Sequence, residues 1–435
     1  MYDTDGFATL DGIDQEEYIL ATYLVMSKSR DLLKRAAAIA VEQTTGTWTP
    51  VPEETPEVRR KHVGKVVGVY EVPDYEMGVP EEIEERAYIV QMAFPFINIG
   101  VQIPMLLSTV IGNISMAGKL KLLDLSFPKQ FLAACKGPKF GIEGIRKYLG
   151  VPRRPLINNM IKPCTGISPE VGAKLFYQAA VGGCDMVKDD ELLGDRPFSS
   201  IADRVKKFME MEKKAYEETG ERTIYTVNVT DRPDRMLENA KRAIDLGVNG
   251  LMVNYLTVGI SALTMLADDP DITVPILAHL DFAGVMYESC YSGISSHLVL
   301  GKLPRIAGAD IVVYPNPYGK FEFMREKHLK IALAHRMALR NIKPIFPMPG
   351  GGVHTGMVAA LTEELGYDYV IGVGGAVHGH PMGAISGAKA LRQAIDAVME
   401  GVPLRDAAKS HKELRAAIEC WGILGEKEKD LFDMK

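Results

Sequence analysis

The chain of 435 residues has few cysteines, no long hydrophobic run and no excess of positive charge. Its five cysteines are scattered without CxxC spacing, which argues against a disulfide framework and against a zinc site. A formal net charge of -6 offers no basic field to a phosphate backbone, so no nucleic-acid partner is expected. No stretch approaches the ~18 apolar residues of a membrane span, and the acidic N-terminus has no apolar signal segment. We therefore expect a cytoplasmic protein that is neither secreted nor membrane-embedded.

The composition is otherwise that of an ordinary folded protein, with 47% hydrophobic and 24% charged residues in a chain long enough for two domains. From about residue 155 onward, short apolar runs alternate with helical patterns, which is typical of repeated βα units around a parallel sheet. Eight strands are predicted: Leu156 to Lys162, Met186 to Glu191, Ile224 to Val229, Leu251 to Tyr255, Pro275 to Leu280, Ile311 to Tyr314, Pro344 to Met348 and Tyr369 to Val373.

The segments between these strands support the same architecture. Ala240 to Gly247 and Gly387 to Gly401 place apolar residues at three- and four-residue spacing and stop at glycine. Eight such units favour a closed (β/α)8 barrel. A doubly wound open sheet is the alternative, but no GxGxxG follows the first strand.

The first part of the chain follows a different pattern. One helical run, SRDLLKRAAAIAVEQ, lies among strand-like segments such as HVGKVVGVYEV and RAYIVQMAFPF. We therefore predict an α/β protein with an N-terminal α+β domain over residues 1–145. A TIM barrel with a C-terminal helical tail is predicted over residues 146–435.

In a βα barrel, the reactive groups lie at the carboxyl ends of the strands. The second predicted strand ends in GGCDMVKDDE, where Lys188 and Asp190 share one face by the two-residue period and Glu191 follows. Carboxylate oxygens suit a hard cation such as Mg²⁺, but an ammonium group cannot ligate one. A salt bridge in a loop is the simpler interpretation of this segment alone.

Further polar segments follow other strands. Lys162 lies in IKPCTGIS, His279 in AHLDF and Lys320 in GKFEF. Taken singly, Lys162 could equally be a surface lysine or a catalytic lysine, and a lone histidine such as His279 is more often structural than catalytic. The loops after the last two strands carry glycines whose N–H groups could bind a phosphate, although simple loop flexibility explains glycines too. These glycines are Gly350, Gly351, Gly352, Gly374 and Gly375.

The segment GGCDMVKDDE is similar to the metal-binding segment of RuBisCO, in which the lysine takes up CO2 and becomes a carbamate that ligates magnesium. The resemblance runs from EQTTGTW through VIGNISMAGKLKLLDL, IKPCTGIS and AHLDF to VHGHPMG, and so covers most of the chain. It implies that Lys188, Asp190 and Glu191 are the metal ligands, with Mg²⁺ and a carbamate on Lys188 as cofactors.

The same resemblance assigns roles to further residues. Lys162 corresponds to the lysine that handles the proton of the enolisation step, and His279 to an active-site histidine. Lys320 corresponds to the mobile lysine of the loop after strand 6, Glu42 to its glutamate partner and Asn113 to a residue that helps hold the metal-bound substrate.

The resemblance also implies a phosphate site formed by Thr47, Trp48, Gly351, Gly352, Gly374 and Gly375. Because Glu42, Asn113, Thr47 and Trp48 reach the neighbouring subunit's barrel in the family, we expect a homodimer with shared active sites or a multimer of such dimers.

Departures from the carboxylase pattern indicate the subfamily. Cys164 replaces a lysine, Leu280 an arginine and Val313 a histidine, and the last two belong to the second phosphate site of the carboxylases. Because the apolar side chains of Leu280 and Val313 cannot compensate the charge of a phosphate dianion, the substrate should carry one phosphate and not two. The serine expected beside the strand 7 glycines is Gly350.

The local sequences YPNPYG, VHGHPMGAISG and GKLKLLDLSFP resemble the RuBisCO-like proteins of methionine salvage. Two positions differ from the enolase of that group, which has a lysine at Asn113 and a serine at Lys320. We expect an Mg²⁺-dependent enolase or isomerase that enolises a keto-sugar monophosphate such as 5-methylthioribulose 1-phosphate or its diketo relative.

The alternatives are decarboxylation or hydrolysis of a branched 3-oxo-sugar-acid phosphate, which Lys320 favours, and true carboxylation of ribulose bisphosphate. A regulatory protein without catalysis would be expected to have lost the metal ligands, and here they are intact.

Overall fold

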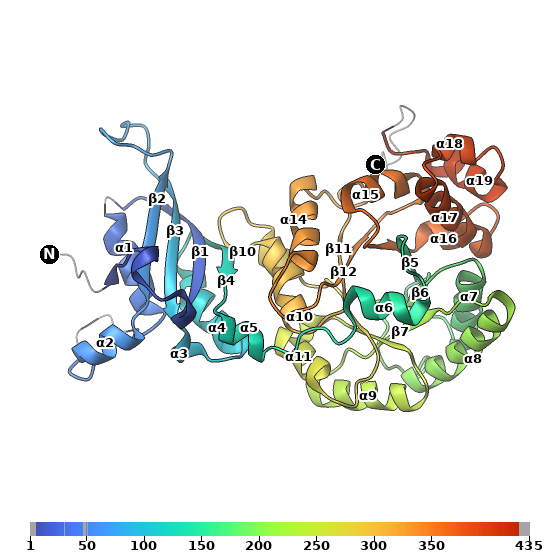
Figure 1. Cartoon of the computed structure of the whole chain (residues 1–435), viewed down its shortest axis with the longest axis horizontal. Coiled ribbons are helices and arrows are strands. Elements are labelled where there is room, and N and C mark those ends of the chain that lie inside the picture. The colour runs from blue at the N-terminus through green and yellow to red at the C-terminus, as the bar shows by residue number, and fades with distance from the viewer. Residues whose placement is uncertain (1–5, 30, 47–48, 50, 426–435) are drawn as a thin grey trace. The chain divides into compact units, whose positions relative to one another are not determined.

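The structure of the protein is a computed structural model that describes residues 6–29, 31–46, 49 and 51–425. Two units are distinguished (Figure 1). The first contains the described residues up to Cys135 together with Phe282–Val299 and Leu339–Ile342. The second contains Lys136–Asp281, Leu300–Ala338 and the described residues from Lys343 onward.

The first unit is built on a five-stranded sheet in the order β10-β4-β1-β3-β2. Its central strand, β1 (Tyr18–Ser27), buries every second residue, as expected for a strand with only one face on the core. β1 pairs antiparallel with β3 (Arg86–Pro95) and with β4 (Leu120–Ser126). The other two strands are β2 (Lys65–Val72) and the short β10 (Gly293–Ile294).

Helices complete the first unit. α1 (Leu32–Glu42) contacts β2 and β3, and its N-terminus is capped by the Asp31 side chain, which accepts a hydrogen bond from the Lys34 N–H. The helix covers the run predicted from the sequence, so the α+β prediction is confirmed. The remaining α-helices described in this unit are α2 (Pro56–His62), α3 (Phe96–Ile99), α4 (Ile103–Ile111), α5 (Lys129–Ala134) and α12 (Gly284–Tyr287).

The second unit contains eight parallel strands in the order β12-β11-β9-β8-β7-β6-β5-β13. The two terminal strands of this order, β12 and β13, pack side by side, which closes the sheet into a barrel (Figure 1). The predicted barrel is confirmed and the open-sheet alternative is wrong. The strands are β5 (Leu156–Met160), β6 (Met186–Lys188), β7 (Ile224–Asn228), β8 (Gly250–Val253), β9 (Ile276–Ala278), β11 (Ile311–Pro315), β12 (Phe346–Gly350) and β13 (Val370–Val373).

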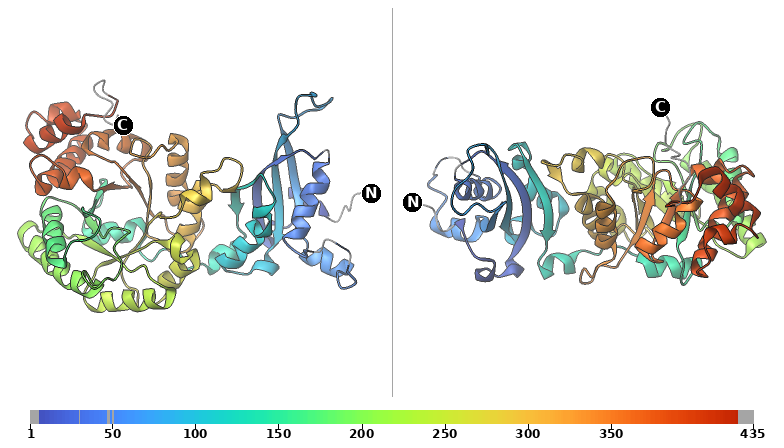
Figure 2. Two further views of the ribbon diagram at one scale, coloured as in Figure 1. Left: turned by 180° about the vertical axis from the view of Figure 1, so that it is seen from behind. Right: turned by 90° about the horizontal axis from the view of Figure 1, so that it is seen from above.

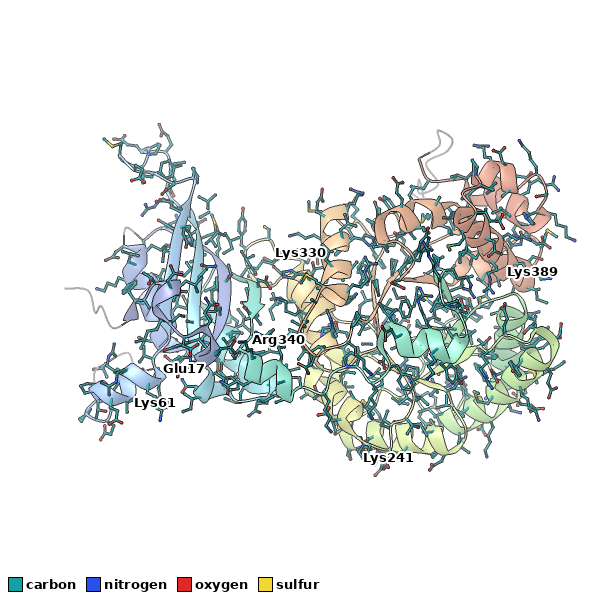
Figure 3. The ribbon with its side chains drawn as sticks, in the orientation of Figure 1. Glu17, Lys61, Lys241, Lys330, Arg340 and Lys389 are labelled. Atoms are coloured by element: carbon teal, nitrogen blue, oxygen red, sulfur yellow. The ribbon has the colours of Figure 1, made fainter. Side chains whose placement is uncertain are left out.

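A ring of helices surrounds these strands (Figure 2). Each long helix turns an apolar face to the barrel: α9, for example, buries Met236, Ala240 and Ala243. Lys330 on α14 and Lys389 on α17 lie on the opposite, exposed faces (Figure 3). The helices of this unit are α6 (Gly141–Leu149), α7 (Pro169–Val181), α8 (Ile201–Thr219), α9 (Pro233–Asp245), α10 (Tyr255–Val258), α11 (Ile260–Asp268), α13 (Leu303–Ile306), α14 (Arg325–Arg336), α15 (Val358–Leu365), α16 (Gly375–His378), α17 (Ala384–Met399), α18 (Leu404–Ala407) and α19 (Lys412–Trp421).

Apolar side chains from the strands and from α6 fill the interior of the barrel, including Met186, Ile224, Leu277 and Phe346. This packing fixes the positions of the strand ends, at which the candidate site residues lie. Among the helices of the described residues, none combines the length and hydrophobicity needed to cross a lipid bilayer.

Candidate active site

The candidate residues of the second unit lie at the carboxyl ends of the barrel strands. Lys162 follows β5, Lys188 is the last residue of β6, and His279 directly follows β9. Lys320 lies in the loop after β11. The glycine runs follow β12 and β13, so the topology gathers all these segments at one end of the barrel, as active sites in this architecture require.

Lys188 is completely buried at the end of β6. Its Nζ donates hydrogen bonds to the Asp189 carbonyl oxygen at 2.7 Å and to Glu191 Oε2 at 3.0 Å. A buried ammonium group requires such a charged partner, because desolvation of an unpaired charge is costly. The pair therefore places the Lys188 nitrogen directly beside one of the predicted metal ligands.

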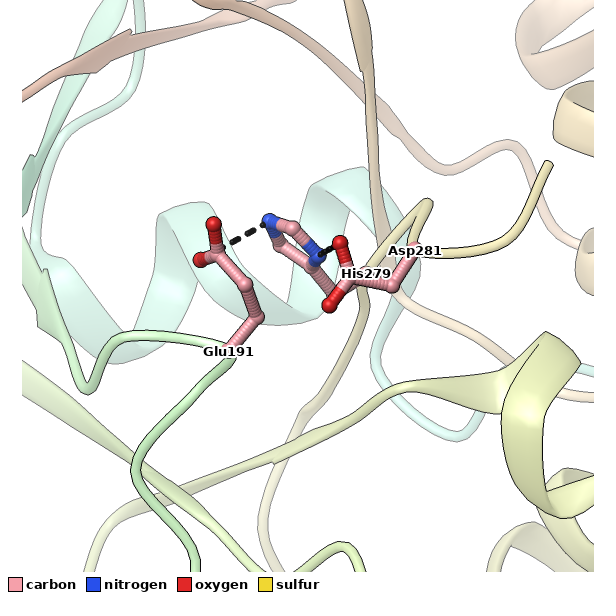
Figure 4. Close-up of side chains that lie close together, drawn as sticks. All are labelled: Glu191, His279 and Asp281. Atoms are coloured by element: carbon pink, nitrogen blue, oxygen red, sulfur yellow. Dashed lines mark ion pairs between the residues drawn. The ribbon is translucent and has the colours of Figure 1, made fainter. Parts of the chain in front are cut away.

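Glu191 also contacts His279. The distance from His279 Nε2 to Glu191 Oε2 is 3.3 Å, and His279 Nδ1 lies 3.5 Å from Asp281 Oδ1 (Figure 4). Burial alone would raise the pKa of Glu191, but the charges of Lys188 and His279 outweigh it and lower this pKa to about 2. One ligand atom from each of Glu191, His279 and Asp281 lies within 4.8 Å of the others, so together they form a candidate metal-binding cluster.

Asp190 has a different neighbour. Its Oδ2 accepts a hydrogen bond of 2.8 Å from Lys162 Nζ, which also donates to Cys164 Sγ at 2.9 Å. Burial would lower the pKa of Lys162, but these hydrogen bonds to Asp190 and Cys164 raise it above its ordinary value. In this arrangement, Lys162 carries a proton on Nζ beside a predicted metal ligand.

Asp189, between the predicted ligands, points away from them into a buried network. Its carboxylate accepts hydrogen bonds from Arg204 Nε at 3.1 Å, Tyr225 OH at 2.8 Å and the Asn228 N–H at 3.0 Å. The side chains of Asp189 and Arg204 are each only 1% exposed. This network anchors the chain behind the predicted ligands.

Two asparagine side chains hold the backbone of the same segment. Asn228 Nδ2 donates to the carbonyl oxygens of Asp190 at 3.3 Å and Glu191 at 3.2 Å. Asn254 Nδ2 donates to the Glu191 carbonyl oxygen at 3.0 Å. These bonds draw the chain out of the sheet, so β6 ends at Lys188. The prediction that this strand continues to Glu191 is wrong. The two-residue period therefore does not extend to Asp190.

The glycines approach the site closely. A Cβ atom at Gly374 would lie 3.1 Å from Lys162 Cε, so the absence of a side chain gives Lys162 room. Gly351 and Gly352 have φ angles of 87° and 81°, which favour glycine. A Cβ atom at Gly375 would meet nothing within 4 Å, which leaves its backbone open to a ligand.

Lys320 lies against this glycine turn through its backbone. Its N–H donates to the Gly351 carbonyl oxygen at 3.2 Å, and a Cβ atom at Gly352 would lie 2.7 Å from the Lys320 nitrogen. The Lys320 ammonium lies 4.9 Å from the centroid of the exposed Phe321 ring.

Three of the four positions that depart from the carboxylase pattern, Leu280, Val313 and Gly350, have apolar surroundings, whereas the fourth, Cys164, accepts a hydrogen bond from Lys162 Nζ. Val313 belongs to the core of the barrel, and the partly buried Leu280 packs against the same core. A Cβ atom at Gly350 would lie 3.6 Å from Val313 Cγ1 and 3.1 Å from Met160 Cε. These positions present hydrocarbon where the resemblance places phosphate-binding groups in the carboxylases.

Two predicted site residues belong to the first unit. Asn113 Nδ2 donates to Glu42 Oε1 at 3.1 Å, so the structure brings this pair together within that unit. Thr47 and Trp48 lie outside the described residues.

Sequence reasoning missed several residues of this region. Asp281 was visible in AHLDF as a carboxylate two residues after His279, but no role was assigned to it. The buried contacts of Asp189 had no local signal, because Arg204, Tyr225 and Asn228 come from other elements. His378 was also missed; its Nε2 accepts a hydrogen bond of 3.0 Å from the Asn159 amide. Burial, with a smaller contribution from the charge of Lys162, lowers the pKa of His378 to about 4.

Comparison with known proteins identifies the two parts of the chain separately. Residues 6–131 match the family model of the ribulose bisphosphate carboxylase large chain, N-terminal domain. Residues 141–421 match the model of the ribulose bisphosphate carboxylase large chain, catalytic domain.

Individual relatives cover almost the whole chain. A ribulose bisphosphate carboxylase-like protein of Archaeoglobus fulgidus is 56% identical over 94% of this chain and 94% of its own. The 2,3-diketo-5-methylthiopentyl-1-phosphate enolase of Geobacillus kaustophilus is 40% identical over 93% of this chain and 98% of its own.

Solved structures agree with these relatives. A rubisco-like protein (MtnW) from Alicyclobacillus acidocaldarius matches with a TM-score of 0.87 and 37% identity, covering 94% of this chain and 100% of its own. The octameric ribulose-1,5-bisphosphate carboxylase/oxygenase from Pyrococcus horikoshii matches with a TM-score of 0.88 and 31% identity, covering 97% of each chain.

Proposed function

Since the chain belongs to the ribulose bisphosphate carboxylase large-chain family, we propose that it is a RuBisCO-like enzyme that enolises a keto-sugar monophosphate. The observation that carries the proposal is the contact chain at the strand ends, in which Lys188 pairs with Glu191 and Glu191 with His279. The enolase of Geobacillus kaustophilus supports a substrate such as 2,3-diketo-5-methylthiopentyl 1-phosphate.

The residues present fit a magnesium ion. Asp190, Glu191 and Asp281 offer carboxylate oxygens, which are the preferred ligands of this hard cation. Lys188, buried beside Glu191, would add oxygen ligands as a carbamate formed with CO2. When bound, the ion would polarise the substrate carbonyl and stabilise the negative charge of the enediolate.

Lys162 is the chain's own group for proton transfer. Its side chain is partly exposed, and its Nζ holds a proton through the hydrogen bonds to Asp190 and Cys164. A positioned lysine of this kind exchanges a proton with the carbon beside a carbonyl, provided that the contact with Asp190 is loosened when the neutral amine is needed. His279, which is 4% exposed, contacts the same Glu191 oxygen as Lys188 does and would orient the substrate oxygens.

The substrate of this proposal carries one phosphate. Gly351, Gly352, Gly374 and Gly375, with Thr47 and Trp48, would bind it through backbone N–H groups. The replacement of two phosphate-binding groups by Leu280 and Val313 removes charge-assisted contacts worth roughly 1.5 to 3 kcal/mol each. A bisphosphate should therefore bind about a hundredfold or more weaker than in a site that retains both groups.

A second candidate function is the decarboxylation or hydrolysis of a branched 3-oxo-sugar-acid phosphate. Lys320, which the backbone of its loop places beside the Gly351–Gly352 turn, favours this candidate. The two functions share an enediolate but differ in products, because only the second cleaves a carbon–carbon bond.

The active form in this proposal is a homodimer or a multimer of dimers. The octameric assembly of the Pyrococcus horikoshii relative and the dimeric assembly of the Hyperthermus butylicus relative support it. We further assign the protein to a reducing cytoplasm, since no disulfide bond is formed among the described residues, which include all five cysteines.

The experiment that tests the function incubates the purified protein with Mg²⁺, CO2 and 2,3-diketo-5-methylthiopentyl 1-phosphate and follows the products by NMR. We expect the enol form of the same carbon skeleton. Release of a one-carbon or two-carbon fragment from a 3-oxo-sugar-acid phosphate would favour the second candidate. CO2-dependent formation of 3-phosphoglycerate from ribulose 1,5-bisphosphate would contradict both.

A further inference from the structure

The loop that carries Lys320 spans residues 316–324, between β11 and α14. Its first residue, Asn316, is buried, and its N–H donates to the Gly350 carbonyl oxygen at 2.9 Å. Near its middle, the loop touches the glycine turn so closely that a Cβ atom at Gly319 would lie 1.8 Å from the Gly351 carbonyl oxygen. The backbone of the loop is therefore fitted to the turn that follows β12.

One carboxylate holds the loop from the side. Glu364, on the neighbouring helix α15, is 6% exposed. Its Oε1 atom accepts hydrogen bonds both from the Tyr318 hydroxyl and from Arg325 Nε. Tyr318 precedes Lys320 by two residues, and Arg325 is the first residue of α14. A single charged acceptor thus joins the two limbs of the loop on either side of Lys320.

The charge balance of this contact is simple. The Arg325 guanidinium, although 57% exposed, supplies the positive charge beside Glu364. His328 lies beneath, with Nε2 3.6 Å from Glu364 Oε2. Burial lowers the pKa of His328 to about 4, so its ring is neutral near pH 7. Hydrogen bonds to an ionised acceptor are stronger than neutral ones, which suits Glu364 to restrain a loop.

We propose that Glu364 is a positioning residue, which through Tyr318 and Arg325 holds the loop against the Gly351–Gly352 turn and so places Lys320 for the reaction. This proposal rests on the proposed function for its kinetic consequence. The restraint of the loop itself does not depend on any activity.

The test removes only the Tyr318 hydroxyl group, which donates to Glu364. The contacts of Glu364 with Tyr318 and Arg325 are called the clamp below. In Tyr318→Phe, a lysine-specific protease should cleave after Lys320 about tenfold faster, because loss of a hydrogen bond to a charged group raises the open population of the loop by about that factor. The cleavage site is identified by mass spectrometry. Tyr177→Phe is the matched control, since Tyr177 donates the same kind of bond to Glu218 between α7 and α8.

The kinetic readout is a double-mutant cycle with Lys320→Ala. If Tyr318 acts by placing Lys320, Tyr318→Phe lowers kcat/KM about tenfold in the wild-type background and has little effect when Lys320 is already alanine. A general loss of structure would lower activity equally in both backgrounds.

The outcomes separate the two proposals. Faster cleavage after Lys320 in Tyr318→Phe but not in Tyr177→Phe, with a kinetic effect that disappears in Lys320→Ala, supports the clamp. Unchanged cleavage, or an undiminished kinetic effect in Lys320→Ala, overturns it. If the wild-type protein shows no enolisation, the proposed function fails, and the cleavage rates alone decide whether Glu364 restrains the loop.

Discussion

Removal of Arg204 is the sharpest perturbation of the candidate site that leaves every predicted ligand in place. Arg204→Met keeps the bulk of the side chain and removes the charge that compensates Asp189. The pair is almost completely buried, with an Nε–Oδ2 distance of 3.1 Å. Breaking a buried ion pair by removing one partner costs about 3 to 5 kcal/mol, because the remaining charge is uncompensated. Since Asp189 retains hydrogen bonds from Tyr225 and Asn228, we expect Arg204→Met to lower the free energy of unfolding by about 3 kcal/mol, the lower end of this range.

The same variant should weaken magnesium activation. Asp189 directly precedes Asp190 and Glu191, so a shift of its carboxylate moves the backbone that carries both. Loss of a supporting contact around a metal site lowers metal affinity by about tenfold to a hundredfold. Urea unfolding would measure the loss of stability, and titration of activity with Mg²⁺ would measure the loss of affinity.

A matched control lies at the other end of the same strand. Arg154 forms a bidentate pair with Asp185, directly before β6, with distances of 2.7 and 2.8 Å and side chains 11% and 4% exposed. Arg154→Met should lower stability without changing the Mg²⁺ concentration required for half-maximal activity. The reasoning is refuted if Arg204→Met changes magnesium activation no more than Arg154→Met does.

Three further predictions concern other residues of the second unit. Burial lowers the pKa of His335 to about 3, so as the pH falls below about 6.5 the unfolded chain binds a proton that the folded chain does not. The free energy of unfolding should therefore fall by about 2 kcal/mol between pH 7 and pH 5 because of this residue. In urea unfolding, His335→Gln should lack this part of the decrease. Lys188→Ala should lose activity that in the wild type requires both CO2 and Mg²⁺, and full wild-type activity after rigorous CO2 depletion would argue against the carbamate. Gly352→Ala should lower the free energy of unfolding by about 1 kcal/mol or more, because the φ of 81° at Gly352 and the nearby Lys320 nitrogen both disfavour a side chain. An equal loss in Gly375→Ala, where a Cβ atom would meet nothing within 4 Å, would contradict this explanation.

The sequence predicted the barrel well because each buried strand is a short apolar run, and such a run is visible without knowledge of its neighbours. The strand ends were less predictable. The second strand was expected to continue to Glu191, but Asn228 from the next strand binds the carbonyl oxygens of Asp190 and Glu191 and ends the pairing at Lys188. A contact between elements distant in sequence leaves no periodic signal.

The candidate site shows the same division. Lys188, Glu191 and His279 were identified as candidates because they follow apolar strands and because their segments resemble those of RuBisCO, and the structure brings them together. The residues that hold the site loops in place were not recognised from the sequence, because Arg204 and Glu364 lie on helices among many other charged residues. Only the fold shows that these two charges are buried and face the loops that carry the site.

If the protein removes a proton beside the carbonyl of a keto-sugar monophosphate, the carbon that loses the proton takes up deuterium from D2O, so deuterium exchange measures the proposed step itself. The purified protein is incubated in D2O with Mg²⁺ and CO2, with 5-methylthioribulose 1-phosphate and ribulose 1,5-bisphosphate in separate reactions, and Lys162→Ala and Lys188→Ala serve as the inactive controls. We predict deuterium incorporation into the monophosphate, dependent on both lysines and on Mg²⁺, and far slower incorporation into the bisphosphate. Exchange confined to the bisphosphate, or exchange into the monophosphate that persists in Lys188→Ala without added metal, would contradict the account.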